Sequence, residues 1–133
     1  MEDCIFCKIV NGDIPCMKVY EDDICLAYLD INPDSDGHTL IIPKKHYKDI
    51  NDIDDESLLH IYKIAKKIMK ILEEKLGCTG FSLLQNNGSI QEVKHYHLHI
   101  KPCYEGRKSV ELIKHKELIK DPKEIYDQIK EAI

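Results

Sequence analysis

The chain has 133 residues, of which 43% are hydrophobic and 32% charged; this balance fits one folded domain over residues 1–133 and excludes a disordered chain. The formal net charge of −5 argues against nucleic acid as a partner, because non-specific nucleic-acid binding depends on neutralising phosphates. No apolar run reaches the roughly 18–20 residues that cross a bilayer, and the acidic N-terminus lacks the apolar segment of a signal peptide. We therefore expect a cytoplasmic protein without a membrane partner, whose 6 cysteines are thiols or metal ligands.

The first half of the sequence is typical of short strands joined by turns. Residues 18–20 and 24–29 flank an acidic turn, and residues 39–42 form a further apolar segment that ends at Pro43. The Asn-Pro-Asp-Ser-Asp-Gly stretch at 32–37 predicts a turn, because proline restricts φ and glycine accepts positive φ.

The second half predicts two helices and two more strands. From residue 54 to 76 apolar side chains recur every three or four positions, which indicates a helix that ends at Gly77. Residues 81–84 and 93–100 are typical of strands, and a last helix is expected to begin after Asp121 with Pro122 in its first turn. Mainly antiparallel strands with one long helix inserted between them predict an α+β fold.

The most informative segment is His95-Tyr96-His97-Leu98-His99. Side chains alternate along a strand, so the three imidazoles should share one face and Tyr96 and Leu98 the other. Two interpretations of the imidazole face remain open. The histidines could hold a metal, or one imidazole could act as a nucleophile while a neighbour handles a proton.

The residues before this segment favour an electrophile that contains phosphorus. Asn86, Asn87, Gly88, Ser89 and Gln91 form a polar turn rich in neutral hydrogen-bond donors. Backbone and amide N–H groups of such a turn can hold phosphate oxygens. An imidazole nucleophile also suits phosphorus, because the adduct can be hydrolysed.

A second motif, Cys4-x-x-Cys7, lies near the N-terminus. Such a pair can be a redox couple, half of a zinc site, or two free thiols, and no thioredoxin-like surroundings support the redox interpretation. A zinc site would need two further nitrogen or sulfur ligands.

The histidine segment resembles the histidine-triad signature of the HIT family, in which three histidines alternate with apolar residues. Residues 4–10, 20–33 and 37–46 are similar to further blocks of that family, so that the resemblance extends over residues 4–104 in order. The pattern is most similar to the Hint-like nucleotide hydrolases. This resemblance implies a HIT-like fold with an antiparallel sheet, one long helix and a C-terminal helix, and it implies a homodimer that binds a purine nucleotide.

The resemblance also implies roles for individual residues. His97 would attack the α-phosphorus of a nucleoside phosphoramidate, adenylate or dinucleoside polyphosphate to give a nucleotidyl-histidine, and His99 would bind the phosphate. The implied nucleotide-binding residues are Asn86, Gln91 and the backbone at Val93 for the phosphate or leaving group, Asp30 for the ribose, and Ile9, Tyr28 and Ile31 for the base.

Family members with the N-terminal cysteine pair resemble a zinc site of two cysteines and two histidines. The resemblance therefore implies zinc bound by Cys4, Cys7, His46 and His95. Four protein ligands leave no open position, so we expect one structural zinc per chain. Two alternatives remain. In the first, a catalytic zinc is held by His95, His97 and either His99 or His46; in the second, the protein is a non-catalytic nucleotide-binding scaffold.

The sequence departs from the family pattern in four places. The loop before Gln91 is shorter, and Glu92 replaces a common serine. Lys101 occupies a position that the signature reserves for an apolar residue, and Cys103 follows Pro102 where many relatives have arginine. These changes bear on the leaving group more than on His97. Among the remaining histidines and cysteines, we expect His38 to make a structural hydrogen bond and His60 and His115 to be solvated. Cys16, Cys25, Cys78 and Cys103 are expected to pack as small hydrophobic side chains.

Overall fold

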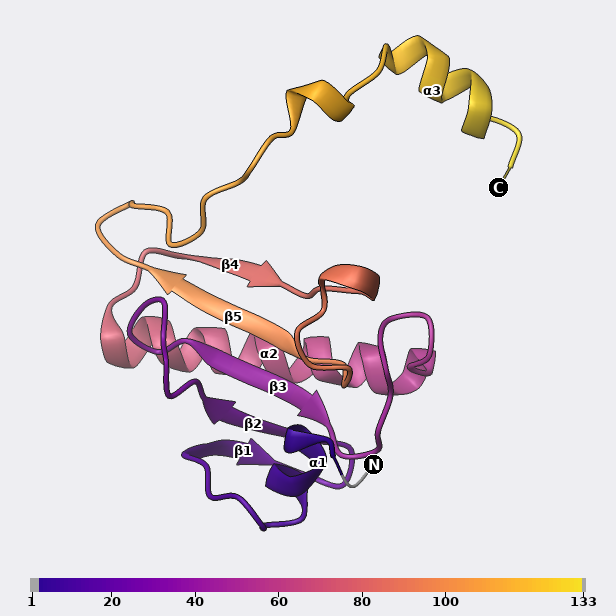
Figure 1. The fold of residues 1–133 in the computed structure, drawn as a ribbon. Coiled ribbons are helices and arrows are strands. Elements are labelled where there is room, and N and C mark those ends of the chain that lie inside the picture. Colours follow the sequence, from indigo (N-terminus) through magenta and orange to yellow (C-terminus); the bar gives the residue numbers. More distant parts are fainter. Residues whose placement is uncertain (1–2, 133) are drawn as a thin grey trace.

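The computed structural model describes residues 3–132, and its centre is a five-stranded antiparallel sheet with the strand order β1-β2-β3-β5-β4 (Figure 1). The helices and strands are α1 (Ile5–Val10), β1 (Lys18–Glu21), β2 (Cys25–Leu29), β3 (Thr39–Pro43), α2 (Asp55–Leu76), β4 (Gly80–Leu84), β5 (Leu98–Cys103) and α3 (Pro122–Ile129). The predicted α+β class is confirmed. Among these described residues, no helix is long and apolar enough to cross a membrane.

The sheet has a separate apolar layer on each face. Along β3 the side chains alternate, so that Ile41 packs with α2 while Leu40 and Ile42 pack with Phe6 of α1. Helix α2 crosses one face, and α1 lies beside β1 and β2 (Figure 1). On β5, Leu98 and Ile100 belong to the α2 layer, whereas His99 is opposite Leu40 and therefore faces the α1 side.

Helix α2 forms where the apolar period predicted it. The Asp54 carboxylate accepts a hydrogen bond from the Ser57 N–H at the start, and Gly77 adopts φ +70° at the end. Its buried stripe faces the sheet and consists of Ile61, Ile64, Ala65, Ile68 and Leu72.

The structure corrects the sequence interpretation of the histidine segment. The strand predicted over residues 93–100 begins only at Leu98, so His95 and His97 precede the sheet ladder. The chain before Leu98 is held differently, through a hydrogen bond from the Tyr96 N–H to the Tyr47 carbonyl. Tyr96 and Leu98 still lie in the α2 layer while His97 lines the opposite face, so the expected alternation is kept without strand pairing.

Residues 107–132 form an arm that leaves the sheet and ends in α3, well away from the other elements (Figure 1). Asp121 caps α3 by accepting a hydrogen bond from the Lys123 N–H, and Pro122 is in the first turn, as predicted. The arm exposes large apolar side chains, including Leu112 at 90% and Leu118 at 74% exposure. Within residues 3–132 of one chain, no apolar layer covers these side chains.

The prediction that His60 is solvated is wrong. Its Nε2 lies 2.5 Å from Oδ2 of Asp22, and only 27% of its side chain is exposed. Asp22 Oδ2 also accepts from the Tyr20 hydroxyl, while Oδ1 accepts from the N–H groups of Ile24 and Cys25. Asp22 therefore joins the β1–β2 turn to α2. His115 is solvated, and the four packing cysteines are buried or partly buried, as expected.

Replacing Asp22 with alanine should destabilise the protein by about 1–3 kcal/mol near pH 7, because several donors lose a charged acceptor. Burial opposes ionisation of Asp22, but the hydrogen bonds from Cys25, His60, Tyr20 and Ile24 prevail and hold its pKa well below the usual value. The stabilisation is therefore present above the unfolded-state pKa of about 3.9 and is lost as the pH falls below it. Urea unfolding should show a smaller difference between wild type and variant at pH 3 than at pH 7. Asp23→Ala, at the exposed neighbour, is the control; an equal difference at both pH values would contradict the assignment.

Candidate active site and metal centre

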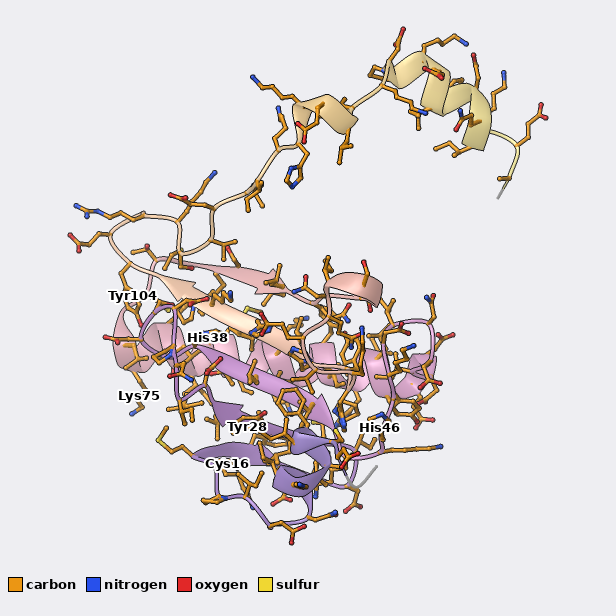
Figure 2. All side chains as sticks on the ribbon, in the orientation of Figure 1. Cys16, Tyr28, His38, His46, Lys75 and Tyr104 are labelled. Carbon is orange, nitrogen blue, oxygen red and sulfur yellow. The ribbon has the colours of Figure 1, made fainter. Side chains whose placement is uncertain are left out.

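A cavity of about 600 Å³ opens on the α1 face of the sheet, between α1, β2 and the segment that leads into β5. Figure 2 labels three of its lining residues, Cys16, Tyr28 on β2 and His38 just before β3. Of the residues predicted from the sequence to hold a nucleotide, the cavity is lined by Ile9, Tyr28, Asp30, Ile31, Asn86, Val93, His97 and His99. The sheet, α1 and the 86–93 turn thus bring together residues that are far apart in the sequence.

Gln91 is not among the residues that line the cavity. Its side chain is 5% exposed, and its amide Nε2 donates to the carbonyl of Lys48, so it ties the 88–91 turn to the loop after His46. Ile31 is 78% exposed at the cavity rim, whereas Tyr28 is buried beneath it. Of the apolar residues expected to contact the base, Tyr28 therefore lies on the buried wall of the cavity and Ile31 at its solvent-exposed rim.

His97 has a defined tautomer. Its Nδ1 lies 2.8 Å from the carbonyl oxygen of His95, and a carbonyl can only accept, so Nδ1 carries the proton. Nε2 then keeps its lone pair. Burial lowers the pKa of His97 and favours this neutral, nucleophilic form, although the hydrogen bond to His95 works in the opposite direction.

His99 is paired with His38. This contact confirms that His38 makes a structural hydrogen bond, as the sequence predicted. The Asp34 N–H donates to Nδ1 of His38 at 3.1 Å, so the proton of a neutral His38 is on Nε2. That Nε2 lies 2.9 Å from Nδ1 of His99 and donates to it. Burial, followed by the neighbouring His97, His38 and Lys101, lowers the pKa of His99 to about 4, so His99 is neutral near pH 7.

Asp30 lies at the end of β2 beside these imidazoles. Its Oδ1 accepts from the Asn32 N–H at 2.9 Å, and its Oδ2 is 3.7 Å from Nε2 of His38. The carboxylate is half-buried on the cavity wall, which leaves acceptor capacity for the hydroxyl groups of a ligand.

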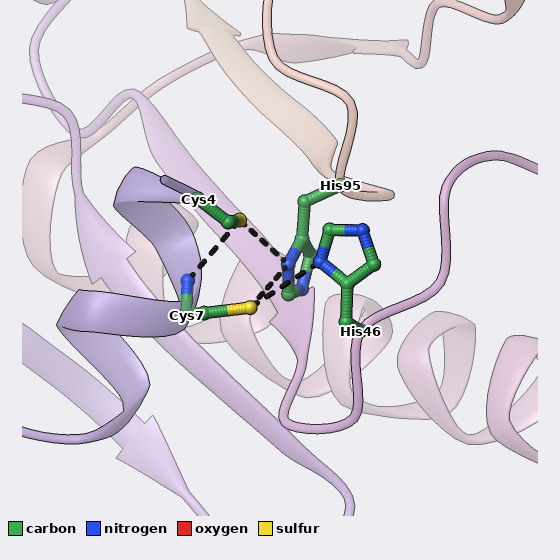
Figure 3. A group of neighbouring side chains, drawn as sticks. All are labelled: Cys4, Cys7, His46 and His95. Carbon is green, nitrogen blue, oxygen red and sulfur yellow. Dashed lines mark hydrogen bonds between the residues drawn. The ribbon is translucent and has the colours of Figure 1, made fainter. Parts of the chain in front are cut away.

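Cys4, Cys7, His46 and His95 meet beside the cavity, with one possible ligand atom from each within 4.8 Å of the others (Figure 3). The Sγ···Nδ1 distances are 3.3 Å for Cys4–His95, 3.3 Å for Cys7–His46 and 3.5 Å for Cys7–His95. Tetrahedral zinc with ordinary bond lengths separates sulfur and nitrogen ligands by about 3.6 Å. The four side chains therefore fit a metal ion of this kind.

The donor chemistry fits as well. His95 donates from Nε2 to the carbonyl of Pro43 at 2.9 Å, so its Nδ1 lone pair faces the two sulfurs. Burial lowers the pKa of His95 to about 4 and keeps that lone pair free. Burial and the adjacent Cys4 raise the pKa of the Cys7 thiol to about 11, so a thiolate at this position needs a cation beside it.

Phe6 was not singled out from the sequence, and Glu92 and Lys101 were noted there only as departures from the family pattern. Phe6, between the two cysteines, packs edge-on against His95 and His97 with ring centroids 5.8 Å and 4.9 Å away. Glu92 lines the cavity, although the sequence suggested only that it departs from the family pattern. Lys101 also lines it and is 8% exposed. The role of Phe6 in packing against His95 and His97 could have been suspected from its position between Cys4 and Cys7 in the sequence.

Comparisons with known proteins agree with this geometry. The model of the HIT domain matches residues 11–106. The chain is 48% identical to adenosine 5'-monophosphoramidase hnt1 of Schizosaccharomyces pombe over 101 residues, which is 74% of this chain and 73% of the relative.

Solved structures extend the likeness to the arm. A HIT family protein from Bacillus anthracis has a TM-score of 0.82 at 38% identity and covers 99% of this chain and 98% of its own. A Zn-bound histidine triad family protein from Mycobacterium smegmatis has a TM-score of 0.77 at 32% identity over 99% of both chains. From its signature, its fold and these matches, the chain belongs to the HIT family.

Proposed function

We propose that this protein is a nucleotidyl hydrolase in which His97 attacks the α-phosphorus of a purine nucleoside 5'-phosphoramidate. One observation carries the proposal: the His95 carbonyl holds the proton of His97 on Nδ1, which leaves the Nε2 lone pair free on a residue that lines the cavity. The Nε2–P bond forms as the P–N bond to the leaving amine breaks, and the amine departs with a proton taken from solvent. Water then attacks phosphorus and gives up a proton to solvent, the P–Nε2 bond breaks, and the nucleoside monophosphate leaves.

The other cavity residues suit the remainder of such a substrate. A neutral His99 with its proton on Nε2 can donate to a phosphate oxygen, and Asn86 and the backbone at Val93 lie on the same cavity. Asp30 can accept hydrogen bonds from ribose hydroxyls. Ile9, Tyr28 and Ile31 offer an apolar surface to the base. In this proposal Gln91 does not contact the substrate. Its hydrogen bond to the Lys48 carbonyl supports the turn that precedes Glu92.

The name of the fission yeast relative supports a phosphoramidate as substrate. Adenylates and dinucleoside polyphosphates share the nucleotidyl half and remain alternative substrates. The exposed carboxylate of Glu92 on the cavity bears on this choice, since it favours a leaving group without negative charge.

We propose that the metal at Cys4, Cys7, His46 and His95 is a structural zinc. Four protein ligands close the coordination sphere, and the Mycobacterium smegmatis relative is Zn-bound. Zinc in this place would join α1 and the loop after β3 to the His95 segment. His95 would then stay in place, and its carbonyl is the group that orients His97.

We also propose that the protein is a homodimer in which the arm packs on a second copy. The apolar side chains of the arm are exposed in the described part of the chain, and a second copy would cover them. The proximal arm, residues 107–120, is rich in lysine, whereas residues 49–56, which lead into the first turn of α2, are acidic. Charge complementarity between copies therefore accompanies the apolar contact.

Replacing His97 with alanine should lower kcat on an adenosine phosphoramidate by about 10³-fold or more, because no other side chain supplies the nucleophile. AMP should still bind, with Kd within about fivefold of wild type, as the remaining cavity is intact. Rapid quench with labelled substrate should trap a nucleotidyl-protein in wild type. The control is His115→Ala, which removes a solvated imidazole. Tight binding without any trapped adduct would instead support a non-catalytic binding protein.

Replacing Cys4 and Cys7 together with serine should remove the bound zinc and lower the unfolding temperature, because both soft ligands are lost. Zinc content measured by plasma mass spectrometry should be one per chain in wild type and near zero in the variant. Cys103→Ser, at a partly buried cysteine outside the cluster, should retain the metal. If chelation abolishes activity while the unfolding transition is unchanged, the zinc is catalytic and the structural assignment is wrong.

Replacing Ile125 and Ile129 with serine should raise the dimer dissociation constant by about tenfold or more, because two exposed apolar contacts of α3 are lost. Light scattering over a dilution series gives the mass and the dissociation constant. Lys123→Ser changes a charged residue of the same helix and serves as the matched control. An unchanged dissociation constant in the isoleucine variants would mean that the arm is not part of the dimer contact.

A further inference from the structure

Lys101 is a buried cation on the wall of the cavity. It follows His99 by two residues on β5, so both side chains lie on the α1 face of the sheet. The family signature has an apolar residue at this position, which needs no partner. The Lys101 ammonium instead donates to Oδ2 of Asp34 at 2.7 Å, from a residue that is only 8% exposed.

Asp34 belongs to the turn before β3 and makes a second contact toward the same site. Its backbone N–H donates to Nδ1 of His38 at 3.1 Å, and His38 in turn lies 2.9 Å from His99. The contacts form a closed ring: Lys101 to the Asp34 carboxylate, the Asp34 N–H to His38, His38 to His99, and His99 back to Lys101 along β5. Each member restrains the position of the next.

The ring determines where the proton of His99 is. With the Asp34 N–H directed at Nδ1, His38 carries its proton on Nε2 and donates to Nδ1 of His99. Neutral His99 then has its proton on Nε2. If the turn moved and His38 took its proton on Nδ1, the direction of the His38–His99 hydrogen bond would reverse. His99 would then present a lone pair, which repels a phosphoryl oxygen.

The other charged and titratable groups around His38 and His99 are compatible with a proton on Nε2 of each imidazole. Asp30 Oδ2 is 3.7 Å from Nε2 of His38 and also favours a proton on that nitrogen. The His97 ring centroid is 5.1 Å from that of His99. Lys101 is the one cation among the residues that line the cavity in the described part of the chain, and it disfavours a second positive charge on His38 or His99.

We propose that Lys101 and Asp34 are positioning residues that hold His99 in the tautomer with its proton on Nε2, ready to donate to the phosphoryl oxygen. The proposal rests on the proposed function in one respect, the binding of phosphate by His99. The tautomer itself follows from the contacts within the chain. An oxyanion donor of this kind acts mainly in the transition state, so its loss should lower kcat more than it raises KM.

The test combines a spectroscopic and a kinetic measurement on the zinc-loaded, full-length protein. Nitrogen NMR on ¹⁵N-histidine-labelled protein distinguishes protonated from unprotonated ring nitrogens. In wild type, Nδ1 of His99 should be unprotonated and Nε2 protonated. In Lys101→Met, the protonated form of Nδ1 should become populated, and kcat on an adenosine phosphoramidate should fall by about tenfold or more.

A conservative variant and a double variant distinguish the loss of the positioning role of Lys101 from a general loss of structure. Lys101→Arg keeps a donor to Asp34 and should restore the wild-type tautomer and most of kcat. Lys101→Met combined with Asp34→Asn should be little worse than Lys101→Met alone, because the two side chains act as a pair. Lys108→Met, an exposed lysine, is the control. Zinc content and unfolding temperature identify any variant that has lost the fold.

The possible outcomes distinguish this inference from the proposed function. A folded Lys101→Met protein with the wild-type His99 tautomer and unchanged kcat would overturn the inference, and so would protonated Nδ1 of His99 in wild type. A wild-type protein with the expected tautomer but no turnover would overturn the proposed function and leave the assignment of His99 intact.

Discussion

The hydrogen bond from Nδ1 of His97 to the carbonyl of His95 determines which nitrogen of the His97 imidazole is free. A main-chain carbonyl is an unambiguous acceptor, so this contact assigns the tautomer without reference to pH or to a ligand. It works only while the His95 main chain stays in place. Residue 95 precedes the ladder of β5, so its position depends on the contacts of its side chain with Pro43 and the two cysteines.

The histidine segment therefore serves two sites from one stretch of backbone. His95 directs its lone pair to Cys4 and Cys7, while His97 and His99 line the cavity. Phe6 packs against both His95 and His97, and it lies between the two cysteines in the sequence. A metal held by Cys4, Cys7, His46 and His95, as proposed, would therefore support the cavity through α1 as well as through His95.

The lining of the cavity has more carboxylates than cations, and the whole chain is likewise acidic. The net charge is −5, and Asp30, Asp34 and Glu92 contribute carboxylates to the lining. Burial lowers the pKa values of His97 and His99 and favours their neutral forms, so in the proposed function they would act on a phosphate as a nucleophile and a hydrogen-bond donor and not as cations. Lys101 is the cation of the described lining, and its hydrogen bond to Asp34 pairs it with one of these carboxylates.

The sequence by itself determined α2 and most strands, because apolar period and caps are local properties. The grouping of the two cysteines with His46 and His95 came from the resemblance to the HIT family. It misplaced the start of β5 and the exposure of His60, because strand pairing and the contact with Asp22 join residues distant in the chain. Only the tertiary structure decided the tautomers of His38, His97 and His99 and separated Gln91 from the cavity. These properties depend on which carbonyl or N–H group lies within hydrogen-bond distance, and a one-dimensional pattern does not contain that information.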